Sequence, residues 1–507
     1  MQTLNLIIPM AGKGKRFVDK SYTKYKTLLE VDKYNTVYDK LVSNFNHKSI
    51  RIILILNNET YLKDKNKFKK KNVTIIKIKN HNNGPLYSLR VAADELNKLI
   101  KQDQGIFISY SDINWTWDIK KVLNYIKDVN ACVFTHTGFH PHLEVNTKSD
   151  FCKIKNGGLE FITQKKKITK DYKLNHLAIG CYYFKKIRYL NNFFDENKYI
   201  NIKKEYYVLS LVNYLIKNKI KVTNYNIKHF VHLGTPEQYE DFINWRNELS
   251  QKNNYYLGKN KFFKKNSCVM LMAGQGKRLK KINSKKFLLQ YKNESIFKHI
   301  LNLYQSKKNI IITNSNLKKE LPKNLNLDFY FVKKNNSMFK TISDSSKFLI
   351  NEYKFFLTSC DCYGKFNFNT LKKKLEKTKA DMCMFGFSFS NLQKKLNNAH
   401  TQLLIKEDKV IDIRVKKNFK ENLLGHGGFF WINNGRVFNY IPNFLSSTYY
   451  KSLRREVIID DYFKFIIKAN LIKASIIKLK NYVHIGSLEE YNEYLYWEKY
   501  FKNAKIK

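Results

Sequence analysis

One pattern occurs twice in this chain: a short apolar run leads directly into a loop that combines glycine with cationic side chains. The first copy spans residues 6–17 and the second spans residues 269–279. Glycine lets a backbone approach a ligand and turn its N–H groups toward it, while Lys and Arg supply positive charge. This combination suits a triphosphate. The candidate residues are Ala11, Gly12, Gly14 and Arg16 in the first loop and Ala273, Gly274, Gly276 and Arg278 in the second.

The length of the chain agrees with a repeat. A chain of 507 residues is too long for a single core, and two domains of roughly 250 residues each are expected. With 43% hydrophobic and 15% aromatic residues, each half can bury a sizeable core. We place the first domain at residues 1–249, a polar linker rich in Lys and Asn at residues 250–265, and the second domain at residues 266–507.

The formal net charge is +51, from 93 Lys and Arg against 42 Asp and Glu. Almost all of the cations are Lys, and they are spread along the whole chain. Direct readout of bases and bidentate phosphate contacts favour Arg, so we expect no specific nucleic acid as a partner. A field this positive attracts anionic substrates and anionic membrane surfaces. A Lys-rich, non-enzymatic binder of anionic polymers is the alternative from a different class.

The seven cysteines are odd in number and do not follow a metal-ligand spacing. Their pattern predicts reduced, mostly buried thiols. The N-terminus enters a strand without the basic and cleavable apolar segments of a signal peptide. No apolar run approaches the ~20 residues needed to span a bilayer. We therefore expect a cytoplasmic protein without a transmembrane segment.

The first half alternates short apolar runs with helical patterns, which predicts an α/β domain with a mostly parallel, Rossmann-like sheet. Ligands of such sheets lie at the carboxyl ends of the strands. The apolar run that begins at Gly105 ends in Asp112, a hard oxygen ligand suited to Mg²⁺, although an isolated Asp there is more often a helix N-cap. Gly84 precedes a predicted helix start, where the backbone could pass close to a flat base. Residues 135–142 carry three histidines, and we expect a polar substrate loop in preference to a zinc site, which would need further ligands.

These landmarks, in this order, resemble the sugar-1-phosphate nucleotidyltransferase family, also called nucleoside-diphosphate-sugar pyrophosphorylases. The resemblance covers nearly all of residues 1–245, and its most specific part is the opening loop followed by Lys26. Two positions depart from the family pattern: Gln164 replaces the usual Glu, and His232 lies where many members carry a second metal-binding Asp. The resemblance implies catalytic roles for Arg16 and Lys26, a base contact at Gly84, a magnesium ligand at Asp112, and sugar-phosphate contacts at Lys165 and Gly180.

The second half repeats most of these landmarks. Lys286 pairs with Lys26, Asp361 with Asp112, and His484 with His232, whereas Ser337 replaces the glycine at position 84. The second copy is either an enzyme with another substrate or a decayed copy, and we favour activity in both. By the same resemblance, Arg278 and Lys286 would be catalytic and Asp361 would bind the metal.

The reaction implied by the resemblance joins an NTP and a sugar 1-phosphate to give an NDP-sugar and pyrophosphate, with Mg²⁺ as cofactor. Surface-polysaccharide precursors are the products expected from the family. The nearest rival is a cytidylyltransferase for phosphocholine or another small phosphorylated alcohol. A glycosyltransferase would require an Asp-x-Asp pair, which neither Asp112 nor Asp361 forms. The base, the sugar and the oligomeric state stay open.

Overall fold

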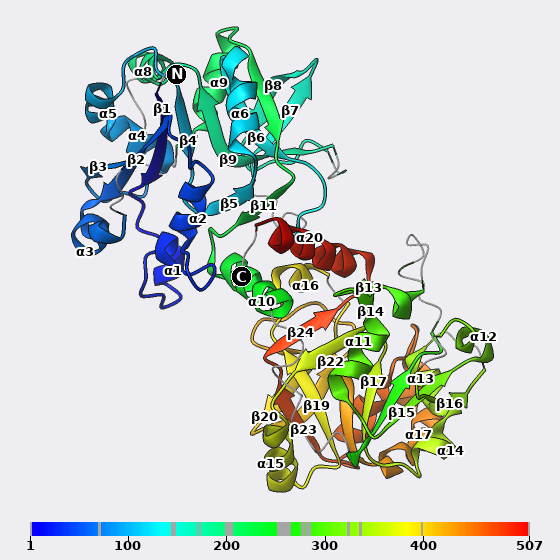
Figure 1. The fold of residues 1–507 in the computed structure, drawn as a ribbon. Helices are drawn as coiled ribbons and strands as arrows, with labels where there is room; N and C mark the ends of the chain where they lie inside the picture. The colour runs from blue at the N-terminus through cyan, green and yellow to red at the C-terminus, as the bar shows by residue number, and fades with distance from the viewer. Residues whose placement is uncertain are drawn as a thin grey trace. The chain divides into compact units, whose positions relative to one another are not determined.

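The computed structural model describes residues 3–68, 72–142, 149–169, 171, 174–197, 206–250, 265–274, 279, 285–321, 325–333, 337–396 and 399–504. The chain divides into two compact units, which we describe separately (Figure 1). Unit 1 comprises Met1–Arg246 and Tyr496–Lys507, and unit 2 comprises Asn247–Leu495. The predicted boundaries therefore need correction at both ends of the second half. Of the predicted linker, residues 251–264 lie outside the described residues.

The C-terminal residues belong to unit 1 because their aromatic side chains are buried there. Trp497 packs against Phe242 and His142, and Tyr496 packs against His136 and His140. A sequence pattern gives no indication of this return, because the partners are more than 200 positions apart along the chain.

A mixed sheet forms the centre of unit 1, with the strand order β10-β6-β9-β4-β1-β2-β3. β1 pairs in parallel with β2 and β4, β2 with β3, and β6 with β10, whereas β9 runs antiparallel to both β4 and β6. The predicted mostly parallel sheet is thus found with one reversed strand. The strands are β1 (Leu4–Met10), β2 (Ile50–Asn57), β3 (Val73–Ile78), β4 (Ile106–Ser109), β6 (Ala131–His136), β9 (His176–Phe184) and β10 (Val222–Asn226), with the hairpin β7 (Phe151–Lys155) and β8 (Gly158–Thr163) and the pair β5 (Ile113–Thr116) and β11 (His229–His232) beside them.

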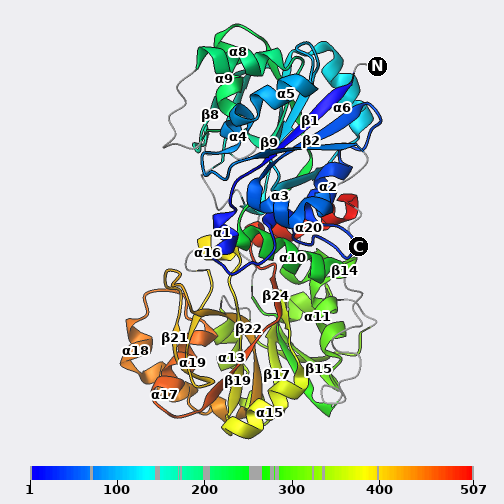
Figure 2. The same cartoon turned by 90° about the vertical axis from the view of Figure 1, so that its left-hand side faces the viewer.

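Helices cover both faces of this sheet (Figure 2). Successive residues of β1 alternate between two apolar cores: Ile7 faces the core formed with α4, α5, α8 and α9, and Leu6 and Ile8 face the core formed with α2 and α6. A strand that is buried on both faces must be apolar throughout, which explains the continuous apolar runs. The helices are α1 (Lys15–Val18), η1 (Lys26–Leu28), α2 (Val37–Ser43), α3 (Asn58–Phe68), α4 (Pro85–Val91), α5 (Ala93–Leu99), α6 (Ile119–Tyr125), η2 (Ile126–Asp128), α8 (Arg188–Glu196), α9 (Leu209–Lys217) and α10 (Pro236–Ser250).

Unit 2 contains a sheet in the order β16-β15-β12-β17-β22-β19-β23-β21-β20. Read from β23 to β16, seven of these strands have the same order and relative directions as the sheet of unit 1. The reversed strand β22 takes the place of β9. The strands are β12 (Ser267–Leu271), β13 (Gln290–Tyr291), β14 (Glu294–Ser295), β15 (Lys308–Thr313), β16 (Asp328–Phe331), β17 (Tyr353–Ser359), β18 (Cys362–Lys365), β19 (Met382–Phe387), β20 (Gln402–Lys406), β21 (Lys409–Arg414), β22 (Leu424–Asn434), β23 (Ala474–Lys478) and β24 (Asn481–His484).

An apolar core on one face of the unit 2 sheet packs against α13, α14, α17 and α19. The helices of this unit are η5 (Lys286–Leu288), α11 (Ile296–Tyr304), α12 (Ser315–Lys318), α13 (Met338–Asp344), α14 (Ser346–Leu349), α15 (Phe368–Thr378), α16 (Asn391–Lys395), η6 (Gly435–Phe438), α17 (Ile441–Ser446), α18 (Thr448–Ser452), α19 (Ile459–Lys468) and α20 (Leu488–Ala504), whose last residues belong to unit 1.

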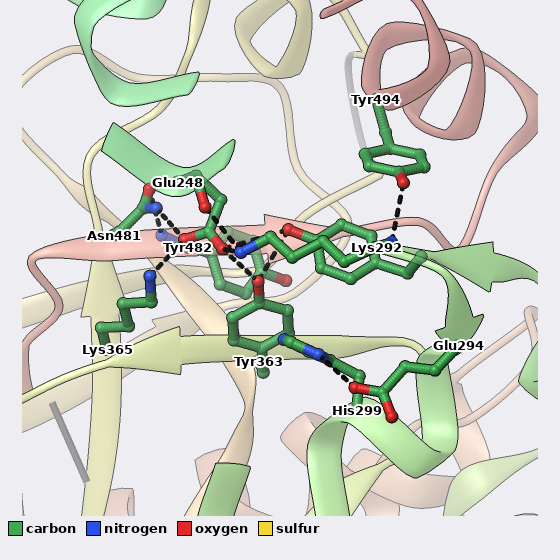
Figure 3. A network of polar contacts seen from close by, with 10 residues as sticks. Glu248, Lys292, Glu294, His299, Tyr363, Lys365, Asn481, Tyr482 and Tyr494 are labelled. Carbon is green, nitrogen blue, oxygen red and sulfur yellow. Dashed lines mark hydrogen bonds and ion pairs between the residues drawn. The ribbon is translucent and has the colours of Figure 1, made fainter. Parts of the chain in front are cut away.

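One buried acid of unit 2 connects several of these elements (Figure 3). The carboxylate of Glu248, only 1% exposed, contacts the ammonium groups of Lys292 and Lys365. It also accepts hydrogen bonds from Tyr363 Oη at 2.6 Å and Asn481 Nδ2 at 2.6 Å. Burial by itself raises the pKa of this carboxyl, but the two ammonium groups outweigh burial and lower the pKa to about 2. The last turn of α10 is thereby held to β18, to β24 and to the β13–β14 turn.

The seven cysteines are free and buried, as predicted. In the described part of the chain, the model has no helix with both the length and the apolar character required to cross a membrane.

Candidate active site

A lysine and an aspartate from distant parts of the sequence meet at the carboxyl end of the unit 1 sheet. Lys26 begins η1, and Asp112 lies in the turn between β4 and β5. Lys26 Nζ lies 2.7 Å from Asp112 Oδ2, and the Asp112 side chain is 24% exposed. Burial raises the pKa of Asp112, but the Lys26 ammonium more than compensates and leaves the pKa below its usual value. The site therefore presents a charged, partly accessible carboxylate.

The glycine-rich loop lies next to this pair and is held by hydrogen bonds to its carbonyl groups. Tyr25 Oη donates to the carbonyl oxygens of Met10 at 2.5 Å and Gly12 at 3.0 Å, and Asn57 Nδ2 donates to Ala11 at 3.1 Å. Because Tyr25 is the neighbour of Lys26, one short segment positions both the loop and the ammonium group. Sequence reasoning missed Tyr25, although a tyrosine beside the key lysine was visible.

The loop itself leaves room for a ligand. A Cβ atom added to Gly12 would have nothing within 4 Å, and Gly14 adopts a left-handed φ of +64° that favours glycine. Arg16 follows on α1 with an exposed side chain. These features are compatible with a phosphate group that approaches the backbone here.

The turn after β11 closes the site on the other side of Asp112. Leu233 donates its N–H to the Asp112 carbonyl at 2.7 Å, and a Cβ on Gly234 would lie 3.1 Å from Asp112 Oδ2. Glycine therefore allows the carboxylate to lie against the turn. Burial lowers the pKa of His232 to about 4 even though Asp112 opposes this effect. His232 is neutral near pH 7 and adds no positive charge.

The structure gives packing reasons for the other two predicted glycines of unit 1. Gly84 has a φ of +85°, and a Cβ there would lie 2.5 Å from the carbonyl oxygen of Tyr206. Gly180 has a φ of +89°, and a Cβ there would lie 2.6 Å from the ring of Tyr110. Both side-chain positions are thus filled by protein, which explains these glycines without a ligand.

Lys165, the predicted sugar-phosphate contact, lies beside a half-buried acid and an aromatic ring. Its Nζ lies 5.2 Å from the centroid of the Tyr207 ring, and its N–H donates to Asp150 Oδ1 at 3.2 Å. Burial raises the pKa of Asp150 to about 6.

The expectation of a polar substrate loop at residues 135–142 is wrong for the three histidines of this segment. His136, His140 and His142 are all buried among aromatic rings.

The equivalent pair in unit 2 has a different environment. Lys286 contacts Asp361, whose carboxylate also accepts a hydrogen bond from Ser359 Oγ at 2.8 Å and lies 3.3 Å from His484 Nε2. The Asp361 side chain is only 2% exposed. Burial lowers the pKa of His484, but Glu490 and Asp361 together outweigh burial and raise it to about 9. Asp361 is consequently matched by two cations of the protein.

The glycine-rich loop of unit 2 is only partly described. Ala273 is buried, and a Cβ on Gly274 would have nothing within 4 Å. Gly276 and Arg278 lie outside the described residues. Lys285 occupies the place of Tyr25, so the hydroxyl that holds the first loop has no counterpart at this position.

The two aspartates differ in their suitability for Mg²⁺. This ion is usually held by one or two carboxylates, with phosphate oxygens and water in the other positions. Asp112 fits such a role because its charged carboxylate remains partly exposed beside the open loop. Asp361 does not fit it, because Lys286, Ser359 and His484 surround its buried carboxylate.

Comparisons with known proteins reveal similarity at the level of structure. No family model matches the sequence. No curated protein matches it in sequence either. Similar solved structures include a nucleoside-diphosphate-sugar pyrophosphorylase from Vibrio cholerae RC9, with 20% identity and a TM-score of 0.39 over 47% of this chain and 99% of that chain. A protein described as a glucose-1-phosphate thymidylyltransferase from Bacillus anthracis, solved with a sucrose, has 17% identity and a TM-score of 0.38 over 47% of this chain and 94% of that chain. The inositol-1-phosphate CTP transferase from T. maritima has 11% identity and a TM-score of 0.38 over 48% of this chain and 95% of that chain.

Proposed function

We propose that unit 1 is a nucleotidyltransferase that joins an NTP and a sugar 1-phosphate to give an NDP-sugar and pyrophosphate. The observation that carries this proposal is the contact between Lys26 and Asp112 beside an open glycine-rich loop whose carbonyls are held by Tyr25. The sequence motifs that resemble the family supply the loop, Lys26 and Asp112, and the structure adds Tyr25. Surface-polysaccharide precursors are the proposed products.

In this reaction an oxygen of the sugar phosphate attacks the α-phosphorus of the NTP. The new O–P bond forms as the bond to the β-phosphate oxygen breaks, and pyrophosphate leaves with the electron pair. The nucleophile is already an anion, so the protein needs to position the reactants and neutralise charge rather than remove a proton.

Each residue of the site has a role that follows from its place. The N–H groups around Gly12 and Gly14, together with Arg16, hold the β- and γ-phosphates of the leaving group. Lys26 steadies the α-phosphate and the incoming phosphate. Asp112 would hold Mg²⁺, which supplies Lewis-acid neutralisation of the phosphate charge when bound. The proposed contact of Lys165 with the sugar phosphate rests on the sequence resemblance.

We further propose that unit 2 is a divergent copy of unit 1 that has lost nucleotidyl transfer. The sequence favours activity in both copies, but two observations support the loss of nucleotidyl transfer in unit 2. Asp361 is enclosed by protein groups, and Lys285 replaces the tyrosine that holds the first loop. The equal strand order of the two sheets supports descent from one fold.

The test is pyrophosphate release in the presence of Mg²⁺, with four NTPs crossed against sugar 1-phosphates and phosphocholine. The variants are Asp112→Asn, Asp361→Asn and the control Asp94→Asn, which changes an exposed carboxylate. Release that is lost only in Asp112→Asn supports the assignment to unit 1. A second substrate pair that is lost only in Asp361→Asn would show that unit 2 is active. Activity with phosphocholine alone would favour the cytidylyltransferase, and no release from any pair would contradict the proposal.

A further inference from the structure

Unit 2 contains a cluster of two histidines and a glutamate that the proposed function does not use; His400 and Glu490 are buried and His484 is half-buried. His400 precedes β20, His484 ends β24, and Glu490 lies in the first turn of α20. The potential ligand atoms of these three residues all lie within 4.8 Å of one another. His400 Nε2 lies 2.9 Å from Glu490 Oε1, and His484 Nδ1 lies 2.6 Å from Glu490 Oε2. Three donors from three separate segments thus converge on one point.

From this convergence we propose that His400, His484 and Glu490 form a binding site for a divalent transition metal of the Zn²⁺ class. Imidazole nitrogen and carboxylate oxygen are common zinc ligands, and two histidines with one glutamate are a known three-ligand set. The site lies in unit 2 and is independent of the magnesium ligand proposed in unit 1.

The surroundings of the cluster orient its side chains for metal binding. A metal-bound histidine usually donates its second ring N–H to a carboxylate, which fixes the ring and its tautomer. His484 has this arrangement, because its Nε2 lies 3.3 Å from Asp361 Oδ2 while its Nδ1 faces the cluster. Ser487 Oγ donates to Glu490 Oε2 at 2.7 Å and so orients the glutamate. Lys286 contacts Asp361 and balances its charge.

Among the described residues, a cluster of this kind occurs in the second unit alone. His484 corresponds to His232 of unit 1, but Glu490 corresponds to Gln238 in the alignment of the two closing turns. Gln238 Oε1 accepts the N–H of Gly234 at 3.2 Å. Unit 1 thus has a neutral amide where unit 2 has a buried carboxylate beside two imidazoles. Mg²⁺ prefers oxygen ligands, so the two imidazoles favour zinc over magnesium.

Metal binding at this site has two physical consequences. The ring nitrogens that bind the metal must be free of protons, so zinc binding should weaken as the pH falls. A bound metal would also link α20 to β24 and to the segment before β20, so it would raise the thermal stability of the folded chain.

The test uses full-length protein without a histidine tag, treated with EDTA, dialysed, loaded with Zn²⁺ and analysed by mass spectrometry for metal content. About one zinc per chain is expected for a site of this ligand set, and His400→Ala and Glu490→Gln should lose it. Asp361→Asn should weaken zinc affinity by about 10–100-fold, because only the orienting carboxylate changes. His299→Asn is the matched control, because His299 is a buried histidine outside the cluster whose Nδ1 lies 2.9 Å from Glu294 Oε1. This substitution should leave the zinc content unchanged.

A second measurement needs only the wild-type protein, in case the variants fold poorly. Zn²⁺ should raise the melting temperature, EDTA should reverse the rise, and Co²⁺ should give the visible absorption of a tetrahedral site. The proposal is overturned if the wild type retains no metal. It is also overturned if properly folded His400→Ala and Glu490→Gln bind zinc as tightly as the wild type. In either case the cluster is an internal network of ion pairs.

Discussion

Lys26 Nζ and Asp112 Oδ2 lie 2.7 Å apart although the two residues are separated by 86 positions in the sequence. The contact joins the segment after the glycine-rich loop to the carboxyl end of a central strand. The Lys26 ammonium lowers the pKa of Asp112 and so keeps this carboxylate charged. A phosphate that arrives at the loop would find a cation and a partly exposed carboxylate already in place, and phosphoryl transfer depends on such positioned charges.

Replacement of Lys26 by Ala should therefore lower kcat/KM for nucleotidyl transfer by roughly 100-fold or more, because a positioned charge at the reacting phosphate is lost. Steady-state pyrophosphate release measures this. Lys24→Ala is the matched control, since Lys24 is an exposed cation two residues away that pairs only with the exposed Glu30 in the described contacts. Equal losses in the two variants would mean that general positive charge, and not the placement of Lys26, supports activity.

Tyr25→Phe should loosen the loop without disturbing the ring packing. Two carbonyl groups lose their donor, and each hydrogen bond contributes about 0.5–1.5 kcal/mol to stability. We expect a lower melting temperature and weaker NTP binding in calorimetric titration. Tyr34→Phe, which removes the hydroxyl of an exposed tyrosine, should change neither quantity. NTP affinity equal to that of the wild type would show that Tyr25 has no part in shaping the loop.

Gly12→Ala and Gly84→Ala should affect different properties: the first should weaken NTP binding, and the second should lower the stability of the fold. Nothing lies within 4 Å of a Cβ at Gly12, so the substitution should preserve stability while its methyl group hinders the phosphate. At Gly84 the left-handed backbone and the Tyr206 main chain oppose a Cβ, and a loss of about 1–3 kcal/mol is expected. Thermal unfolding and NTP titration of both variants separate the two effects. A strong NTP-binding defect in a stable Gly84→Ala protein would instead support a base contact there.

Glu248→Gln should destabilise unit 2 by roughly 3–5 kcal/mol at pH 7, because Lys292 and Lys365 would be left without their buried anion. The folded pKa of about 2 lies below the value of an unfolded glutamate. The stabilisation is therefore complete above pH ~4.3 and is lost as the pH falls through 4 toward 2.

Urea unfolding at pH 7 and pH 3 measures this dependence. The stability difference between the wild type and Glu248→Gln should shrink at pH 3. The exposed pair of Glu95 and Lys98 gives the control Glu95→Gln, which should have little effect at either pH. A difference that stays constant between the two pH values would show that the Glu248 charge is not the stabilising feature.

The strands of the fold were predictable because the runs that form them are apolar on both faces. Residues 51–56, for example, form a continuous apolar run after Arg51 and lie within β2. The reversed direction of β9 was not predictable, since an apolar pattern contains no information on strand direction. The Glu248 network was also hidden, because its partners Lys292, Tyr363 and Asn481 lie 44, 115 and 233 positions away.

The role of an individual site residue depends on what fills the space around it, and the sequence does not contain this information. The family resemblance implies site roles for both Lys26 and Asp112, and the two side chains lie in contact. The resemblance implies a base contact at Gly84 and a sugar-phosphate contact at Gly180, and in the structure protein atoms occupy the place of a side chain at both positions. A sequence shows that a side chain is missing and does not show whether a ligand, a ring or a main chain takes its place.

The measurement that tests the central claim most directly is the exchange of radiolabelled pyrophosphate into NTP in the presence of Mg²⁺ and a panel of NDP-sugars. This reverse reaction reports the making of the bond between the α- and β-phosphates, which simple hydrolysis cannot produce. We predict label in one NTP with one NDP-sugar, with loss of the label in Asp112→Asn and its retention in Asp361→Asn. Absence of labelled NTP with every NDP-sugar, in a folded protein, would contradict the assignment of nucleotidyl transfer to unit 1.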